Sequence, residues 1–138
     1  MVTTLIVETP GQGLHEITSL VSRHVADFCR STARAEALCT FFIRHTSASL
    51  LIQENADPSA RRDLERWLAR LAPEHDPLYP HDAEGPDDMP AHVRAALTQT
   101  SLTIPVIAGR LALGTWQGIY VWEHRRAPHR RQIVVHVG

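Results

Sequence analysis

An α+β fold, in which two main helices interrupt a mostly antiparallel β-sandwich, is the class that this sequence predicts. Apolar residues alternate in short β-branched runs near both ends of the chain, whereas two inner segments repeat them at helical spacing. The 138 residues, 43% hydrophobic and 21% charged, can bury one sizeable core. We therefore expect one domain over residues 1–138.

The first half of the chain predicts strands on either side of a helix. Residues 3–9 form a β-branched run that Pro10-Gly11 ends, which indicates a strand and a turn. A helix over about 14–29 follows from the helical spacing of Ile17, Leu20, Val21, Val25 and Phe28. Residues 37–44 again read as a strand, and residues 47–53 either continue it after a kink or form its hairpin partner.

A second helix is expected to begin at Pro58, because Asp57-Pro58 has the form of an N-cap followed by proline at the first helical position. Its apolar stripe consists of Leu64, Trp67, Leu68 and Leu71. Residues 73–90 contain five of the nine prolines and six acidic residues, which predicts a long irregular loop. Loops of this length inside a domain are often functional, and a short helix over about 91–97 should follow.

The last third predicts antiparallel strands near residues 101–107, 110–115, 118–124 and 131–137. Turns are expected at Ala108-Gly109 and over residues 125–129. Alternation is clearest in the last strand, where Ile133, Val135 and Val137 should share one face.

The charge balance excludes several classes of function. A net charge of −1 gives the molecule no general attraction for nucleic acid or an anionic membrane. All 14 basic residues are arginine, so neither a Schiff-base lysine nor a P-loop lysine is available, and a bound phosphate would be held by arginine, backbone N–H groups or a metal. With two cysteines, no basic-then-apolar leader and no membrane-length apolar run, the sequence favours the cytoplasm.

Three of the nine histidines, His45, His81 and His92, lie in or beside irregular segments. Neutral imidazole is a common zinc ligand, and three histidines with one open position form a catalytic metal geometry. Their spacing alone favours solvated or capping histidines over a shared metal site. If they converge, they would hold a divalent metal, zinc or magnesium, with Glu54 or Asp57 nearby as supporting or alternative ligands.

Two further segments concentrate polar groups. Glu54, Asn55 and Asp57 lie at a helix N-terminus, where N–H groups favour anions, although simple helix capping would also explain them. In Gly114–Gly118, two glycines flank Thr115, Trp116 and Gln117. Trp116 and Gln117 can stack on and hydrogen-bond a flat polar ring, and a turn with a packed tryptophan is the alternative.

Several blocks resemble the YjbQ-type family in order and spacing, over roughly residues 3–137. They are His45-Thr46-Ser47-Ala48-Ser49-Leu50, Glu54-Asn55-Ala56-Asp57-Pro58, Pro90-Ala91-His92, Ser101–Pro105 and the long run Gly109–Ile119. The sequence departs from the family pattern at Asp87-Asp88-Met89, where many relatives have an asparagine-containing stretch.

The resemblance implies a homotrimeric β-sandwich with sites near the subunit boundaries. It also implies secondary thiamine-phosphate synthase activity, which joins a pyrimidine diphosphate to a thiazole phosphate and releases pyrophosphate. For that reaction the expected catalytic residues are His45, Glu54, Asp57, Trp116 and Gln117. The expected substrate-binding residues are Asn55, Arg110, Thr115 and Glu123, with Arg110 on the anion and Glu123 on the pyrimidine amino group.

Two other functions fit the same residues. One is a different metal-dependent activity on a small phosphorylated metabolite, and the other is a non-catalytic trimer that binds a metabolite. A binding protein would be stabilised by its ligand without turning it over.

Overall fold

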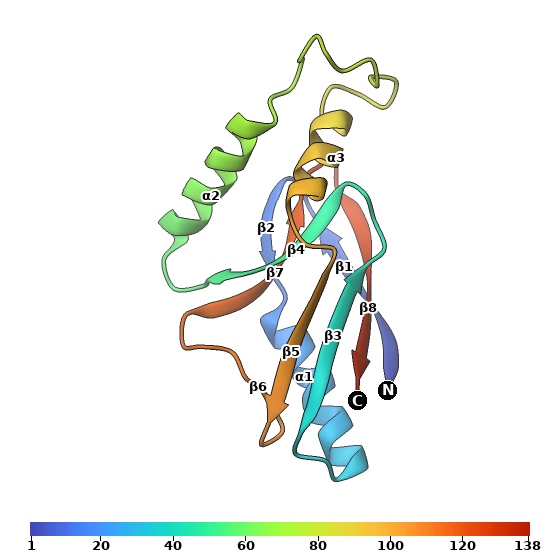
Figure 1. Cartoon of the computed structure of the whole chain (residues 1–138), viewed down its shortest axis with the longest axis vertical. Coiled ribbons are helices and arrows are strands. Elements are labelled where there is room, and N and C mark those ends of the chain that lie inside the picture. The colour runs from blue at the N-terminus through green and yellow to red at the C-terminus, as the bar shows by residue number, and fades with distance from the viewer.

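The chain folds into three helices and eight strands, in a computed structural model that describes residues 1–138 (Figure 1). The strands are β1 (Val2–Thr9), β2 (Gly13–Glu16), β3 (Ala37–Ile43), β4 (Ala48–Glu54), β5 (Ser101–Ile107), β6 (Arg110–Leu111), β7 (Gln117–Glu123) and β8 (His129–Val137). The helices are α1 (Thr18–Thr32), α2 (Pro58–Leu71) and α3 (Asp88–Leu97). None of them is long and apolar enough to cross a membrane. The expected α+β class is confirmed, with a third helix beside the two main ones.

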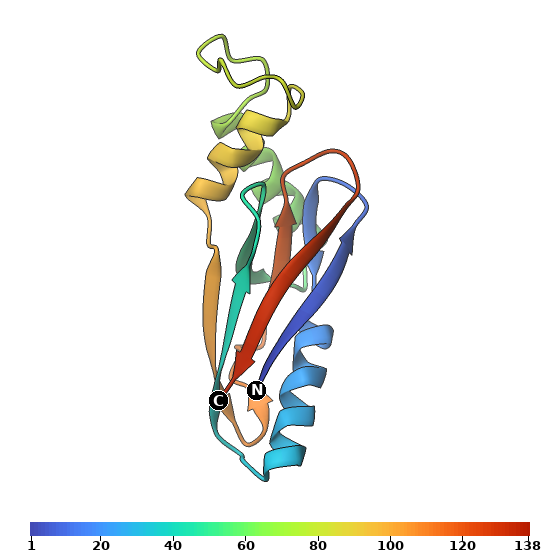
Figure 2. The same cartoon turned by 90° about the vertical axis from the view of Figure 1, so that its right-hand side faces the viewer.

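The strands form two antiparallel sheets that lie face to face (Figure 2). One has the order β1-β8-β3-β5-β6 and the other β2-β7-β4. Residues 47–53 were expected to continue β3 or to form a hairpin with it, and both alternatives are wrong. Instead β4 belongs to the second sheet and pairs with β7, because the link over residues 44–47 carries the chain from one sheet to the other.

The core lies between the sheets and under α1. The predicted alternation in β8 is confirmed, since Ile133, Val135 and Val137 are all buried. On α1, the expected stripe is also buried at Val21, Val25 and Phe28. The helix begins at Thr18 and not near residue 14, because residues 13–16 pair with β7 as strand β2. Tertiary pairing therefore overrides a helical pattern at this boundary.

Helix α2 begins where the sequence predicts, and the Asp57 carboxylate accepts a hydrogen bond from the Ser59 N–H at 2.8 Å. Its apolar stripe is less buried than expected. Leu68 packs in a small cluster under the helix, whereas Trp67 and Leu71 are about half exposed, at 51% and 52%. The helix therefore stands at one side of the second sheet, as Figure 1 shows.

The expected strand over residues 110–115 is wrong beyond Leu111. Strand β6 has only two residues, after which the chain leaves the first sheet and enters the second at Gln117. The other strands of the last third, β5, β7 and β8, lie within two residues of their expected bounds. At the other end of the molecule, residues 72–87 form the long loop that the proline-rich segment predicts (Figure 1).

A buried ion pair joins the two sheets at the end nearest α3. Arg131 of β8 donates to both carboxylate oxygens of Glu123 on β7, from Nη2 at 2.5 Å and from Nε at 2.7 Å. The Thr9 hydroxyl and the Arg125 N–H complete the acceptor sites of Glu123. Burial raises the pKa of Glu123, but these hydrogen bonds outweigh it and hold the pKa below its usual range.

His124 follows β7 and is 1% exposed. Its Nε2 lies 2.8 Å from the Ser49 hydroxyl of β4, on the adjacent strand of the sheet. Burial lowers the pKa of His124 to about 3, and the positive charges of Arg94 and Arg131 act in the same direction. The imidazole is therefore neutral in the folded protein at physiological pH.

This neutral histidine makes the stability of the fold depend on pH. Between about pH 6.5, the ordinary histidine value, and about 3, the unfolded chain binds a proton at His124 that the folded chain does not. The contribution is fully present above pH 6.5 and falls by up to about 1.4 kcal/mol for each pH unit below it. Denaturant unfolding of wild type and His124→Gln from pH 7 to 5 should show this loss only in wild type. Parallel curves would contradict the assignment.

Candidate functional site

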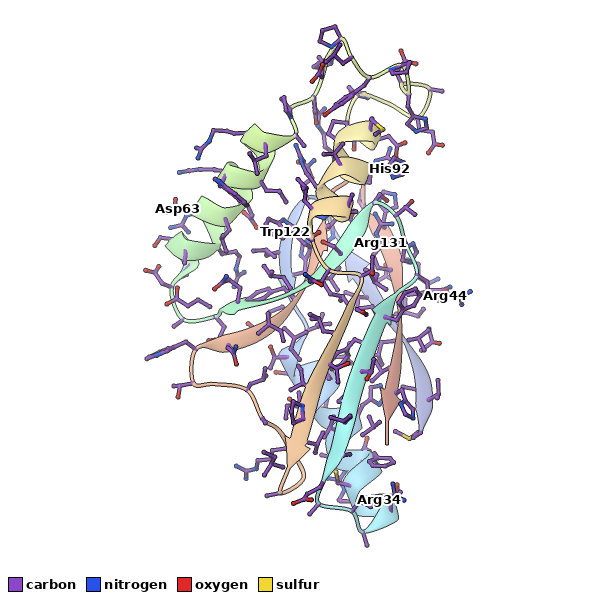
Figure 3. The ribbon with its side chains drawn as sticks, in the orientation of Figure 1. Arg34, Arg44, Asp63, His92, Trp122 and Arg131 are labelled. Carbon is purple, nitrogen blue, oxygen red and sulfur yellow. The ribbon has the colours of Figure 1, made fainter.

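Three side chains converge where the long loop meets α3. His81 comes from the loop, while Asp88 and His92 lie four residues apart on one face of α3. Asp88 Oδ2 is 2.7 Å from His81 Nε2 and 3.2 Å from His92 Nε2, and one potential ligand atom from each residue lies within 4.8 Å of the others. We refer to His81, Asp88 and His92 as the histidine–aspartate cluster. Figure 3 labels His92 on α3.

Asp88 is the buried centre of this cluster, with 1% of its surface exposed. Its other oxygen, Oδ1, accepts a hydrogen bond from Arg125 Nη1 at 2.5 Å. Burial raises the pKa of Asp88, but the hydrogen bond from His81 and the nearby positive charges outweigh it and lower the pKa overall. Asp88 is therefore a carboxylate at neutral pH, although it is enclosed by protein.

The backbone carbonyl of Thr46 determines which ring nitrogen of His92 carries a proton. The Nδ1 atom of His92 lies 3.0 Å from the Thr46 carbonyl oxygen, which can only accept, so Nδ1 carries a proton. In a neutral ring, Nε2 then presents a lone pair to the Asp88 carboxylate. Two acceptors at 3.2 Å repel each other unless a proton or a cation lies between them. The arrangement therefore favours a proton or a cation between His92 and Asp88. A carbonyl partner at the other ring nitrogen, as at Nδ1 here, is typical of metal-binding histidines.

Arg125 and Asp87 hold the surrounding backbone in place. Asp87 Oδ2 accepts from Arg125 Nε at 3.1 Å and from the Arg126 N–H at 2.9 Å, and Arg125 also donates to the Glu84 carbonyl. Burial raises the pKa of Asp87, but the hydrogen bonds from Arg126 and Arg125 outweigh it and lower the pKa overall. These contacts join the long loop and the start of α3 to the β7–β8 turn.

An open cavity of about 560 Å³ lies within the long loop beside the cluster. His81 lines it together with His75, Tyr79 and Asp82. Its size falls in the usual range for a small-molecule site. A ligand in this cavity would therefore contact the cluster through His81.

His45 does not lie with the other two histidines within the chain. Its Nε2 accepts a hydrogen bond from the Gln132 N–H of β8 at 2.8 Å, and Asp88 takes the place beside His81 and His92 that His45 was expected to fill. Burial lowers the pKa of His45, with the Arg131 charge acting in the same direction. The segment that begins at His45 reaches the cluster through its backbone, at Thr46.

Most of the other predicted site residues gather at the opposite end of the second sheet. The Asn55 N–H donates to the Trp116 carbonyl at 3.0 Å, and Glu54 and Gln117 are register partners at the ends of β4 and β7. Asp57 caps α2, and Thr115 is exposed in the link between β6 and β7, whereas Arg110 lies exposed on β6 of the first sheet. The seven residues of β7 separate this group from the cluster by roughly 20 Å.

Glu123 is the exception, since it lies at the cluster end of β7 but is 1% exposed and fully engaged in the buried ion pair. The carboxylate has no free acceptor site for the amino group of a substrate.

Asp88, Asp87 and Arg125 were not expected at the site. The sequence signal for Asp88 was its i, i+4 relation to His92, which the helix expected over 91–97 was too short to include. Pro90 was expected at the end of the proline-rich loop, whereas the structure accommodates it within the first turn of α3. Asp88 thus lies in the stretch Asp87-Asp88-Met89, which the resemblance had set apart from the other blocks.

Comparison with known proteins shows the same family over nearly the whole chain. The profile described as "UPF0047 protein YjbQ-like" matches residues 3–138. The UPF0047 protein sll1880 of Synechocystis is 51% identical over 133 residues, which are 96% of this chain and 88% of that protein. The UPF0047 protein YjbQ of Escherichia coli O157:H7 is 40% identical over 131 residues, 95% of this chain and 92% of that protein.

Solved structures support the same assignment. The conserved hypothetical protein TT1486 of Thermus thermophilus superposes with a TM-score of 0.85 at 34% identity, covering 99% of both chains. A YjbQ/UPF0047 family protein of Clostridium acetobutylicum superposes with a TM-score of 0.81 at 33% identity, covering 100% of this chain and 99% of that one. The chain therefore belongs to the YjbQ-like UPF0047 family.

Proposed function

We propose that this protein is an enzyme that acts on a small phosphorylated metabolite with a divalent metal held by His81, Asp88 and His92. The observation that carries the proposal is the contact between His92 Nε2 and Asp88 Oδ2 at 3.2 Å, with Nδ1 of the same ring already committed to Thr46. A metal ion held by these two side chains would remove the repulsion between their lone pairs. The anionic Asp88 and neutral imidazoles are the protonation states that metal binding requires.

The donor set favours zinc or another transition metal over magnesium. Two imidazoles and one carboxylate match catalytic zinc sites, whereas magnesium prefers oxygen ligands. Three protein ligands leave a position for water or substrate. His81 donates from Nε2 to Asp88, so binding a metal through that nitrogen would require its proton to move to Nδ1 or to leave the ring.

The surrounding residues would support this site through position and charge. Arg125 keeps Asp88 oriented from the opposite oxygen, and the Thr46 carbonyl fixes the ring of His92. When bound, a metal would stabilise the negative charge that develops on phosphate oxygens. The cavity beside His81 gives the rest of a metabolite room to bind.

Thiamine-phosphate formation is the first reaction to test, because the resemblance of the sequence blocks implies it. In that transfer the bond between the pyrimidine CH₂ carbon and the diphosphate oxygen breaks, and a bond from the thiazole nitrogen to the same carbon forms as pyrophosphate leaves. The cluster is suited to the leaving diphosphate. Trp116 and Gln117, with Asn55 and Glu54 beside them, have the chemistry to hold a heterocycle, but they lie too far away in the same chain.

A trimer would resolve this separation by bringing the heterocycle-binding end of one subunit to the cluster of the next. The outer face of the five-stranded sheet exposes apolar residues that an assembly would cover, among them Ile6, Leu38 and Phe42 at 42%, 52% and 49% exposure. We therefore propose a homotrimer that uses this face.

The metal site is tested by zinc binding. Dialysed protein should bind one zinc ion per chain in calorimetric titration. His92→Ala should weaken binding by at least about tenfold, as expected for losing a metal ligand when even supporting contacts contribute 10–100-fold. His45→Ala is the matched control, since His45 lies outside the cluster, and it should bind zinc as wild type does. Equal affinities in wild type and His92→Ala would rule the cluster out.

The reaction is tested by assaying thiamine phosphate formation with and without zinc. Wild type should show metal-stimulated turnover, and His92→Ala should lose at least about tenfold in kcat, equivalent to about 1.4 kcal/mol of transition-state stabilisation. Trp116→Ala, a change at an exposed residue, should raise KM for the pyrimidine diphosphate without altering zinc affinity. Zinc binding without turnover above background would favour another reaction on a phosphorylated metabolite.

The assembly is tested by light scattering at micromolar concentration, where the mass should be three times the 15.4 kDa of the chain. Phe42→Asp should give monomers with an unchanged circular dichroism spectrum, because Phe42 contributes little to the core of one chain but would place a charge in the covered face. Thr40→Ser, on the same strand, serves as the control. A monomeric wild type would exclude sites shared between subunits.

A further inference from the structure

A second cavity, of about 290 Å³, lies on the other side of α3 from the histidine–aspartate cluster, between α2 and the end of β7. Its walls include Glu65 and Leu68 of α2, Arg94 of α3, Trp122 of β7 and His124. Arg94 follows Asp88 by six residues, which at 100° per residue places it on a different face of the helix. In Figure 3, Trp122 is labelled between α2 and α3.

Arg94 is the unusual residue of this cavity. It is 7% exposed, yet its guanidinium makes one hydrogen bond, from Nη2 to the Ala72 carbonyl at 2.7 Å. Its Nε is enclosed and has no hydrogen-bond partner, and no carboxylate forms an ion pair with it. A guanidinium carries five N–H donors, so most of them lack a protein acceptor. Buried charges in proteins are normally paired, and an unpaired one is costly.

The carboxylates near Arg94 are already engaged. Glu65 accepts from the Leu14 N–H at 2.8 Å, and Glu123 is paired with Arg131. Asp87 accepts from Arg125 and Arg126. His124 on the cavity wall is neutral and adds no charge. Arg94 therefore keeps N–H groups that have no protein acceptor and that an anion in the cavity can meet.

The other residues that line the cavity indicate what the rest of such a molecule would contact. Trp122, at 5% exposure, and the buried Leu68 provide an aromatic and an apolar surface. The volume is close to the lower end of the range for small-molecule sites. We propose that this cavity binds a small metabolite whose oxyanion, phosphate or carboxylate, contacts the Arg94 guanidinium while its flat or apolar body lies against Trp122.

The proposal is tested on protein freed of metal with EDTA, by calorimetric titration at constant ionic strength. Phenyl phosphate and benzoate carry the two anions on the same ring, and benzyl alcohol is the uncharged control. One of the two anions should bind and benzyl alcohol should not, and the anion preferred identifies the ligand class. Arg94→Met, which keeps the length of the side chain without its charge, should weaken binding by at least about tenfold, because charge-assisted hydrogen bonds are the strong ones.

His81→Ala separates this site from the histidine–aspartate cluster and should bind the anion as wild type does. Binding of neither anion, equal binding in Arg94→Met, or a loss in His81→Ala as large as in Arg94→Met would overturn the proposal. If Arg94→Met does not fold, the Nε–H resonance of Arg94 in ¹⁵N NMR spectra of wild type gives the answer directly. It should shift on titration with the binding anion, and an unchanged resonance at saturation would overturn the proposal.

Discussion

The buried ion pair between Glu123 and Arg131 is the contact on which the functional end of the molecule depends. It connects β7 of one sheet to β8 of the other, and Arg131 also donates to the Ser47 hydroxyl at 3.0 Å. Ser47 adjoins Thr46, whose carbonyl orients His92, and Glu123 accepts from the N–H of Arg125, whose side chain holds Asp88. Removing one partner of such a pair typically costs about 3–5 kcal/mol, because the other charge is left buried alone.

Local patterns in the sequence predicted the elements well where one face of an element meets the core. The alternation in β8 and the stripe on α1 matched the buried residues, and Asp57-Pro58 correctly marked the start of α2. The pairing of β4 could not be predicted in this way. Its partner β7 lies more than 60 residues away, and alternation does not identify which strand supplies the neighbouring hydrogen bonds.

Only part of the histidine–aspartate cluster was predicted, because its third member depends on where a helix begins. His81 and His92 do lie together, but the group between them is Asp88, which was hidden by a helix boundary that proline made difficult to place. The segment from His45 to Ser49 was expected to supply a catalytic and metal-binding side chain, His45. In the folded chain it mainly provides hydrogen-bond partners for other groups. The Thr46 carbonyl accepts from His92, the Ser47 hydroxyl accepts from Arg131, and the Ser49 hydroxyl bonds to His124. Spacing along a sequence shows side-chain types, whereas the partners of each group, backbone carbonyls among them, become visible only in the fold.

The weak burial of α2 affects how the molecule opens. Leu68 is its one fully buried side chain, and Arg94 anchors its last turn at Ala72. Elements with so few buried apolar contacts separate from the native structure at a lower free energy than global unfolding. We expect the amides of α2 to exchange with solvent faster than those of β3 and β8. Because α2 forms one wall of the Arg94 cavity, the same local opening that exposes its amides also provides a route into that cavity.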